Sequence, residues 1–212
     1  MDNAELTARL LDAHGRTYAD EAGITLRDKP APLYRLLVLA TLCASRISSR
    51  TATAAARELF RAGLRTPRAM AGSSWQERVD ALGRAHYVRY DESTSTALGE
   101  GSALVLDRWK GDLRRLREEA GRDPASVREL LREVPRIGPV GAEIFCREAQ
   151  DVWPELRPSL DERARRTAGD LGLPHSPAGL SALVPPEELA RLAAALVRVG
   201  LAKDGVRDLL GA

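Results

Sequence analysis

The segment Leu130–Cys146 reads LLREVPRIGPVGAEIFC, a composition typical of a tight turn between two helices. We expect one helix to end near Glu133 and the next to begin near Pro139. The first N–H groups of the second helix then lack intrahelical partners, and with the positive end of the helix dipole they favour an anion. Gly138 and Gly141 would let a phosphate approach the backbone closely. A plain αα-hairpin, whose glycines serve only the turn, fits the same residues.

A carboxylate follows about 20 residues beyond the hairpin, in the segment SLDERARR. Ser159 and Glu162 have the spacing of a helix-capping box, so we expect Ser159 to cap a helix and Asp161 to lie in its first turn. An acidic residue in a first turn complements the helix dipole, and that role alone would explain Asp161. Its position shortly after the hairpin favours a functional role in addition.

The elements that position these segments are predicted to be helices. Apolar residues recur at helix spacing, as in the stretch Leu33–Cys43, and no run alternates apolar and polar residues over the length of a strand. Thr66 and Asp123 each place a capping side chain before a proline at the first helical position. The pattern predicts an all-α fold of roughly ten helices.

Composition narrows the class of protein. Of the 212 residues, 44% are apolar and 29% charged, which is typical of a globular chain, and with 4% aromatic residues the core must be mainly aliphatic. A net charge of +2 permits a nucleic-acid partner without arguing for one. Two cysteines, Cys43 and Cys146, are too few for an iron–sulfur cluster or a zinc site that needs four. We therefore expect no metal and no other cofactor.

The sequence contains no segment typical of a signal peptide or of a membrane span. The first ten residues, MDNAELTARL, have neither a basic region nor an apolar core, so we expect no signal peptide. The longest apolar stretch, Leu36–Ala44, is far shorter than a membrane span. We expect a cytoplasmic, nucleoid-associated protein that has no membrane partner.

The hairpin and the aspartate together resemble the helix–hairpin–helix superfamily of base-excision DNA glycosylases, of the endonuclease III type. Val134–Gly138 stands where that family has Leu-Pro-Gly-Val-Gly, and Leu160–Arg166 stands where it has Val-Asp-Thr-His-Val-x-Arg. The similarity covers about Leu33–Pro174. Further segments that resemble the family, in chain order, are Leu42–Ser49, Thr66–Met70, Ala85–Tyr87 and Leu171–Leu173.

The resemblance implies two helical lobes, with the DNA between them. Residues 29–152 would form a six-helix lobe that contains the hairpin, and residues 1–28 and 153–212 together would form the second lobe, which carries Asp161. The target nucleotide is flipped out of the duplex, and Asp161 is the catalytic carboxylate. By the same resemblance the backbone N–H groups of the hairpin bind one phosphate. The residues expected to contact DNA are Arg46, Tyr87, Arg136, Gly138, Val140, Gly141 and Arg163.

The departures from the family pattern shape the expected chemistry. Val140 stands where bifunctional members place a lysine, and valine cannot form an imine, so strand cleavage by that route is not expected. Arg136 replaces the first hairpin glycine, where it either crowds the phosphate or adds a contact to it. Arg46 stands where the family uses a glutamine to fill the gap left by the flipped base, and Glu162-Arg163 replaces Thr-His. The C-terminal cysteines that hold the family's cluster have no counterpart.

These observations predict a monofunctional DNA glycosylase that excises a damaged or modified base by aspartate-assisted hydrolysis. Its partner would be double-stranded DNA, and we expect a monomer. Two alternatives fit the sequence. The first is a helix–hairpin–helix DNA-binding protein that has lost the chemistry, and the second is a helical protein-interaction domain with no role on DNA.

Overall fold

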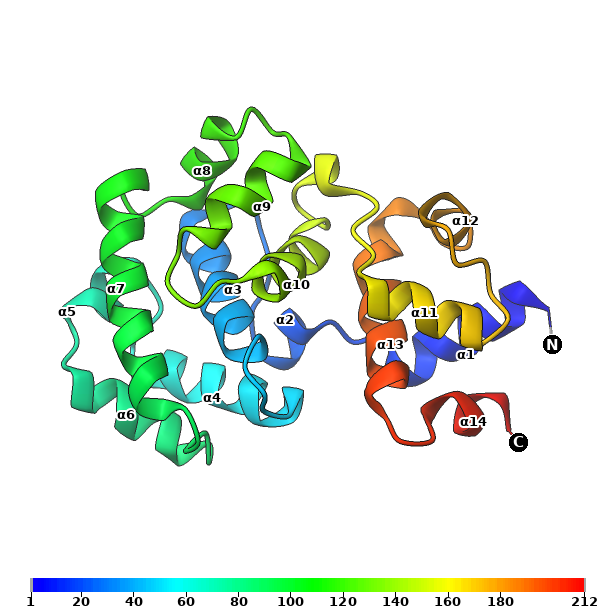
Figure 1. Ribbon diagram of the computed structural model, residues 1–212, viewed down its shortest axis with the longest axis horizontal. Coiled ribbons are helices and arrows are strands. Elements are labelled where there is room, and N and C mark those ends of the chain that lie inside the picture. Colours follow the sequence, from blue (N-terminus) through cyan, green and yellow to red (C-terminus); the bar gives the residue numbers. More distant parts are fainter. Residues whose placement is uncertain (1, 212) are drawn as a thin grey trace. The chain divides into compact units, whose positions relative to one another are not determined.

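The computed structural model describes residues 2–211, and within that range the chain is all-helical, with no strand (Figure 1). This confirms the predicted fold class. The helices outnumber the roughly ten expected because several are too short for a periodic pattern to reveal, such as α2 (Tyr18–Glu21) and α12 (Pro177–Ser181). None of the helices in the described range is long and apolar enough to cross a membrane.

The chain divides into two compact units. The first, called here the hairpin unit, is Ala19–Phe145. The second, called the aspartate unit, combines the residues up to Tyr18 with those from Cys146 onward. The division expected from the resemblance lay at residues 28/29 and 152/153. One helix, α10 (Pro139–Ala149), begins in the hairpin unit and ends in the aspartate unit.

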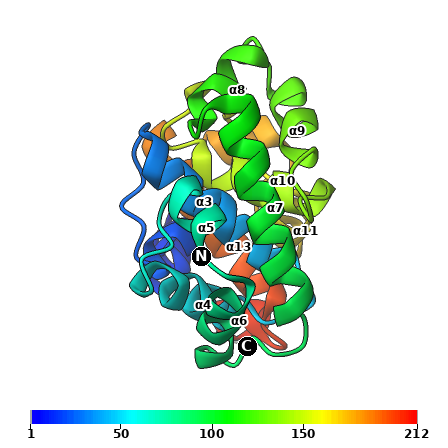
Figure 2. The ribbon, with the colours of Figure 1, turned by 90° about the vertical axis from the view of Figure 1, so that its left-hand side faces the viewer.

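The hairpin unit is built around α3, a helix that is buried along most of its length because nearly every residue in it is apolar. It packs against α4 and α8, while the 19-residue α7 packs against α5, α6 and α8 (Figures 1 and 2). After α2, the helices of this unit are α3 (Pro30–Cys43), α4 (Ser49–Arg61), α5 (Pro67–Gly72), α6 (Trp75–Arg84), α7 (Asp91–Trp109), α8 (Leu113–Glu119), α9 (Pro124–Arg132) and the start of α10.

The core is mainly leucine, valine and alanine, as the composition predicts. The few aromatic residues nevertheless supply its largest buried side chains, including Trp109, Trp153 and Tyr34. The predicted helix starts at Thr66 and Asp123 are confirmed. The Thr66 hydroxyl accepts a hydrogen bond from Ala69 N at 3.2 Å, and the Asp123 carboxylate accepts one from Ser126 N at 2.7 Å.

The aspartate unit is organised by α13, whose apolar face packs against α1, α11 and α14. A glycine allows α11 and α13 to approach closely, because a Cβ at Gly200 would lie 2.2 Å from the Thr167 hydroxyl. The helices of this unit are α1 (Asn3–His14), the 3-10 helix η1 (Pro154–Leu156), α11 (Glu162–Asp170), α12, the 3-10 helix η2 (Pro186–Glu188), α13 (Leu189–Leu201) and α14 (Gly205–Leu210).

Candidate functional site

The hairpin forms where the sequence predicts it. Helix α9 ends at Arg132, and α10 begins at Pro139. The connecting turn is anchored by Ile137, which is buried. Ala142 N donates to Gly138 O at 3.0 Å, and the amide groups of Val140 and Gly141 lie ahead of that bond, in the first turn of α10. The positive end of the helix dipole is therefore at the hairpin, as an anion site requires.

The two hairpin glycines serve different purposes. A Cβ at Gly138 would meet no atom within 4 Å, and the φ angle of Gly138 is not in the left-handed region, so neither packing nor backbone conformation requires glycine there. A Cβ at Gly141 would lie 3.3 Å from Ile137 Cδ1 and 3.5 Å from Ala44 Cβ, so this glycine lets α10 pack against the end of α3. Close approach of a ligand to the backbone remains a reason for glycine at 138 alone.

Arg136 holds the left-handed backbone conformation of the turn, with φ 66°. Its side chain is exposed, but its guanidinium is engaged within the hairpin unit. Nη1 donates to Ser93 Oγ at 2.6 Å, and Nη2 lies 3.4 Å from Ser45 Oγ. The guanidinium carbon also lies 5.8 Å from the centre of the Tyr90 ring, within the range of a cation–π interaction.

Tyr87 and Arg46 lie beside this network. We expected Tyr87 to contact DNA, but its side chain is completely buried, and its hydroxyl donates to Ser45 Oγ at 2.9 Å. A buried ring presents no surface to a ligand, so Tyr87 positions the loop after α3. Arg46, the next residue in that loop, is exposed. The hairpin unit thus joins three segments that the sequence singled out: the loop after α3, the loop before α7 and the hairpin.

In the aspartate unit, Asp161 is itself the N-cap of α11, and its Oδ1 accepts a hydrogen bond from Ala164 N at 2.9 Å. The expected cap at Ser159 is wrong. Ser159 is buried two residues before the N-cap, where its N–H and its C=O both bond to the side-chain amide of Gln150 at 3.0 Å. That pairing ties the backbone at Ser159 to Gln150, so the helix starts at Glu162.

A buried arginine holds the other oxygen of Asp161. Arg147, from α10, donates through Nη1 to Asp161 Oδ2 at 2.6 Å, and its Nε lies 3.7 Å from Glu148 Oε1. The side chains of Arg147 and Glu148 are at most 4% exposed, whereas that of Asp161 is 18% exposed. Burial alone would lower the pKa of Arg147, but the carboxylates of Glu148 and Asp161 raise it above its usual value. Arg147 therefore stays charged.

Comparison with known proteins identifies the fold. No family model matches the chain, and no curated protein matches it. Two solved structures of endonuclease III bound to DNA do match, one a trapped covalent intermediate with an estranged adenine and the other a non-covalent complex. Each is 16% identical to this chain in sequence, with TM-scores of 0.51 and 0.52. Each alignment covers 93% of this chain and 85% of the endonuclease III chain.

The fold is endonuclease III-like. At this level of identity the likeness establishes the fold alone, so activity has to be argued from side chains.

Two further candidate residues of the endonuclease III-like fold are accessible. Val140 is 62% exposed in the first turn of α10, and Arg163 is exposed on α11, two residues after Asp161.

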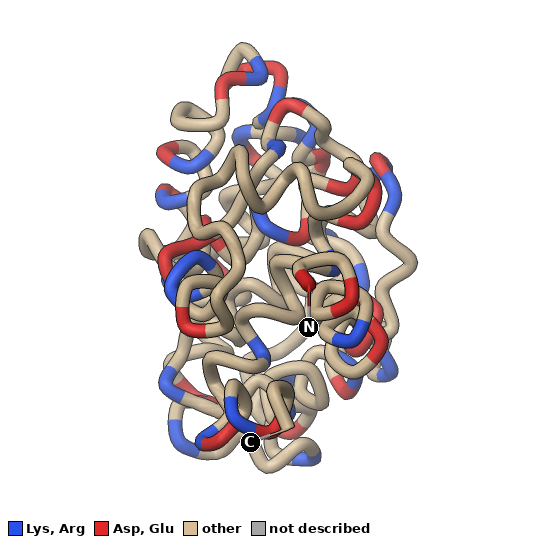
Figure 3. The backbone as a smooth tube through the Cα atoms, turned by 90° about the vertical axis from the view of Figure 1, so that its right-hand side faces the viewer, with Lys and Arg blue, Asp and Glu red and all other residues tan. Residues whose placement is uncertain are grey.

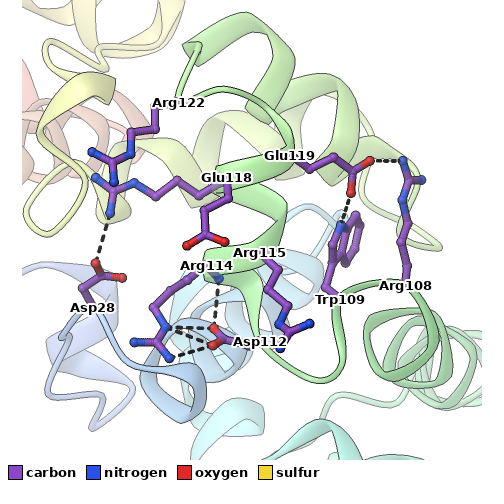
Figure 4. Close-up of a pocket in the computed structure, with 10 residues that line it drawn as sticks. Asp28, Arg108, Trp109, Asp112, Arg114, Arg115, Glu118, Glu119 and Arg122 are labelled. Atoms are coloured by element: carbon purple, nitrogen blue, oxygen red, sulfur yellow. Dashed lines mark hydrogen bonds and ion pairs between the residues drawn. The ribbon is translucent and has the colours of Figure 1, made fainter.

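A hollow of about 720 Å³ lies beside α8, and none of the candidate residues lines it (Figure 4). Its walls are charged, but the charges are largely paired. Arg117 bonds to Asp28 at 3.0 Å, Arg114 to Asp112 at 2.7 Å, and Arg108 to Glu119 at 2.5 Å. The lining residues are Asp28, Arg108, Trp109, Asp112, Arg114, Arg115, Arg117, Glu118, Glu119 and Arg122.

Charge pairing recurs along the helices of the endonuclease III-like fold. Figure 3 shows basic and acidic residues interspersed along the backbone. Ion pairs three residues apart join Arg132 to Glu129 and Arg191 to Glu188 at 2.8 and 2.6 Å. Affinity for an anionic partner would therefore depend on local contacts rather than on the overall charge of +2.

Arg147 is a candidate functional residue that no motif in the sequence singles out. The available indication was a charged pair, Arg147-Glu148, inside an otherwise apolar helix end. Charged residues are rarely buried unless they are paired, so such a pair points to a buried partner elsewhere in the chain.

No group of three His, Cys, Asp or Glu side chains that could hold a metal ion occurs among residues 2–211.

Proposed function

We propose that this protein binds duplex DNA through its hairpin and releases a base by hydrolysis of an N-glycosidic bond, with Asp161 as the catalytic carboxylate. The observation that carries the proposal is the open backbone at Gly138, beside the first amide groups of α10, in an endonuclease III-like fold. A glycine that neither packing nor φ demands is explained by close approach of a phosphate. Arg46 is exposed to add a charged contact.

The proposed chemistry follows from the charge that develops on the sugar. As the glycosidic bond breaks, its electron pair leaves with the base, and the sugar becomes cationic. A fixed carboxylate stabilises that cation, and a water molecule then adds to the anomeric carbon, while the proton that the water loses ends on the departed base. Asp161 is held for this role by Ala164 N and Arg147, and Arg147 is shared with Glu148. The product is an abasic site in an intact strand, because Val140 offers no amine.

A second candidate function is DNA binding without chemistry. The observation in its favour is that both oxygens of Asp161 already have structural partners, since Oδ1 caps α11 and Oδ2 pairs with Arg147. If Asp161 serves only as the cap of α11 and the partner of Arg147, it stabilises the helix start and the buried arginine, and no reaction takes place.

The test is a panel of duplexes that each carry one damaged or modified base. The proposal predicts abasic sites in at least one duplex, with strand breaks that appear only after alkali. Binding to the duplexes with no release from any of them would support the DNA-binding alternative. If no salt-dependent binding to DNA is found, the hairpin is only a turn, and the protein-interaction alternative gains support.

A further inference from the structure

The Arg136 side chain lies at the junction of the three segments in the hairpin unit. One nitrogen donates to Ser93 in the first turn of α7, and another lies 3.4 Å from Ser45 in the loop after α3. The Ser93 hydroxyl in turn donates to Tyr90 O at 3.2 Å, and Ser45 Oγ also accepts the hydroxyl of Tyr87. One guanidinium therefore links the hairpin to both neighbouring loops.

The backbone at Arg136 makes this side chain unexpected. A φ of 66° is in the left-handed region, where glycine is favoured and a long side chain is disfavoured. The Arg136 side chain is exposed, so burial of apolar area does not account for it either. Lys110 and Arg122 hold the same backbone conformation, so what distinguishes Arg136 is its set of contacts with Ser93, Ser45 and Tyr90.

We propose that Arg136 is a positioning residue that fixes the hairpin amides relative to the Arg46 loop, and that it does not itself contact a phosphate. The inference rests on the DNA binding proposed above. Two of its nitrogens are directed at Ser93 and Ser45, and its guanidinium carbon lies 5.8 Å from the centre of the Tyr90 ring, so its directional bonds lie within the unit. With the hairpin held against the loop, the open backbone at Gly138, the Val140 amide and Arg46 meet a DNA backbone together.

The salt dependence of DNA binding separates a positioning role from a phosphate contact. Each phosphate contact that a protein makes releases counterions, so its loss lowers the slope of log Kd against log salt concentration by about one. We expect Arg136→Met to weaken binding to an undamaged duplex about tenfold without changing this slope. Arg46→Ala is the matched control, and it should lower the slope by about one.

Two more variants test which part of Arg136 acts. Arg136→Gly suits the left-handed backbone but removes the side chain, so it should bind as weakly as Arg136→Met. Ser93→Ala removes the partner of the shortest Arg136 hydrogen bond. The loss of DNA affinity in the double variant should equal that of Arg136→Met alone, because both substitutions break the same contact. A reduced slope in Arg136→Met would show a phosphate contact instead. Wild-type affinity in Arg136→Gly would show that only the backbone conformation matters. Either result overturns the proposal.

A measurement without DNA keeps this inference distinct from the proposed function. Hydrogen exchange of the Ile137 and Ala142 amides in the free protein reports how firmly the hairpin is held, because these groups donate to Val134 O at 2.9 Å and to Gly138 O at 3.0 Å. We expect exchange to be about tenfold faster in Arg136→Met, with the melting temperature unchanged because the residue is exposed. Unchanged exchange would contradict the positioning role. If the wild-type protein does not bind DNA, the proposed function fails, whereas this exchange result still decides whether Arg136 positions the hairpin.

Discussion

The side-chain hydrogen bonds that stabilise the hairpin are exposed to solvent, whereas those around Asp161 involve a buried charge. The hairpin is a surface turn, in which Gly138 is open and the Arg136 contacts are solvent-accessible. Asp161 instead pairs with Arg147, a charge that is almost completely buried. A surface turn can be changed with little effect on stability, whereas a buried charge that loses its partner is strongly unfavourable. The two regions should therefore respond differently to the loss of an arginine.

The largest effect is expected from Arg147→Met. Removing the guanidinium takes an ion-pair partner from the buried Glu148 and from the half-buried Asp161, so the free energy of unfolding should fall by about 3–5 kcal/mol. Urea denaturation measures the change. Arg136→Met is the control in the hairpin, where we expect less than about 1 kcal/mol because the side chain is exposed. Equal effects of the two variants would contradict the contrast between the regions.

The next effect concerns DNA affinity. Gly138→Asp places a negative charge where the proposal has a phosphate, so binding should weaken about tenfold or more for every duplex sequence. Circular dichroism should be unchanged, because a side chain at 138 meets open space. Titration of labelled duplexes measures the affinity, and equal affinity of variant and wild type would mean that the hairpin is only a turn.

Alanine at each hairpin glycine sharpens the assignment of their roles. Gly138→Ala should leave the free energy of unfolding unchanged or raise it by about 0.5 kcal/mol, since the added methyl group clashes with nothing and stiffens the unfolded chain. Gly141→Ala should lower it by about 1 kcal/mol, because its Cβ lies within 3.5 Å of Ile137 and Ala44. Chemical denaturation distinguishes them, and the reverse order would refute the assignment.

The smallest effect is the pH dependence of the helix that leads into the hairpin. Asp123 accepts a hydrogen bond from Ser126 N at the start of α9. This bond lowers the pKa of the Asp123 carboxyl below its usual value. A lowered pKa in the folded state contributes stability above the unfolded-state pKa of about 3.9, and this contribution is lost as pH falls through the folded-state value. Asp123→Asn should therefore show a flatter loss of stability in acid, measured by thermal melts between pH 5 and pH 2. An unchanged profile would contradict the cap.

The sequence predicted the features that depend on neighbouring residues. The all-α class, the two ends of the hairpin and the caps at Thr66 and Asp123 follow from local periodicity and turn chemistry, and the structure confirms them. The features that depend on distant residues were missed or wrong. The Ser159 cap failed because Gln150, nine residues earlier, binds the Ser159 backbone. The burial of Tyr87 depends on a fold-level contact with Ser45, and the partner of Asp161 lies fourteen residues away.

The central claim is that Asp161 acts on a sugar cation and does not merely cap a helix. It is tested most directly by single-turnover base release with wild type and Asp161→Asn, on whichever lesion duplex the wild-type protein processes. Asparagine can still cap α11 through its one carbonyl oxygen, but its NH2 group cannot accept from Arg147, which keeps the carboxylate of Glu148. The variant should lose some stability, whereas its DNA affinity, measured where it is fully folded, should change little. Asparagine carries no charge, so the rate constant of release should fall by a factor on the order of 100 or more. Release by Asp161→Asn at the wild-type rate would contradict the account.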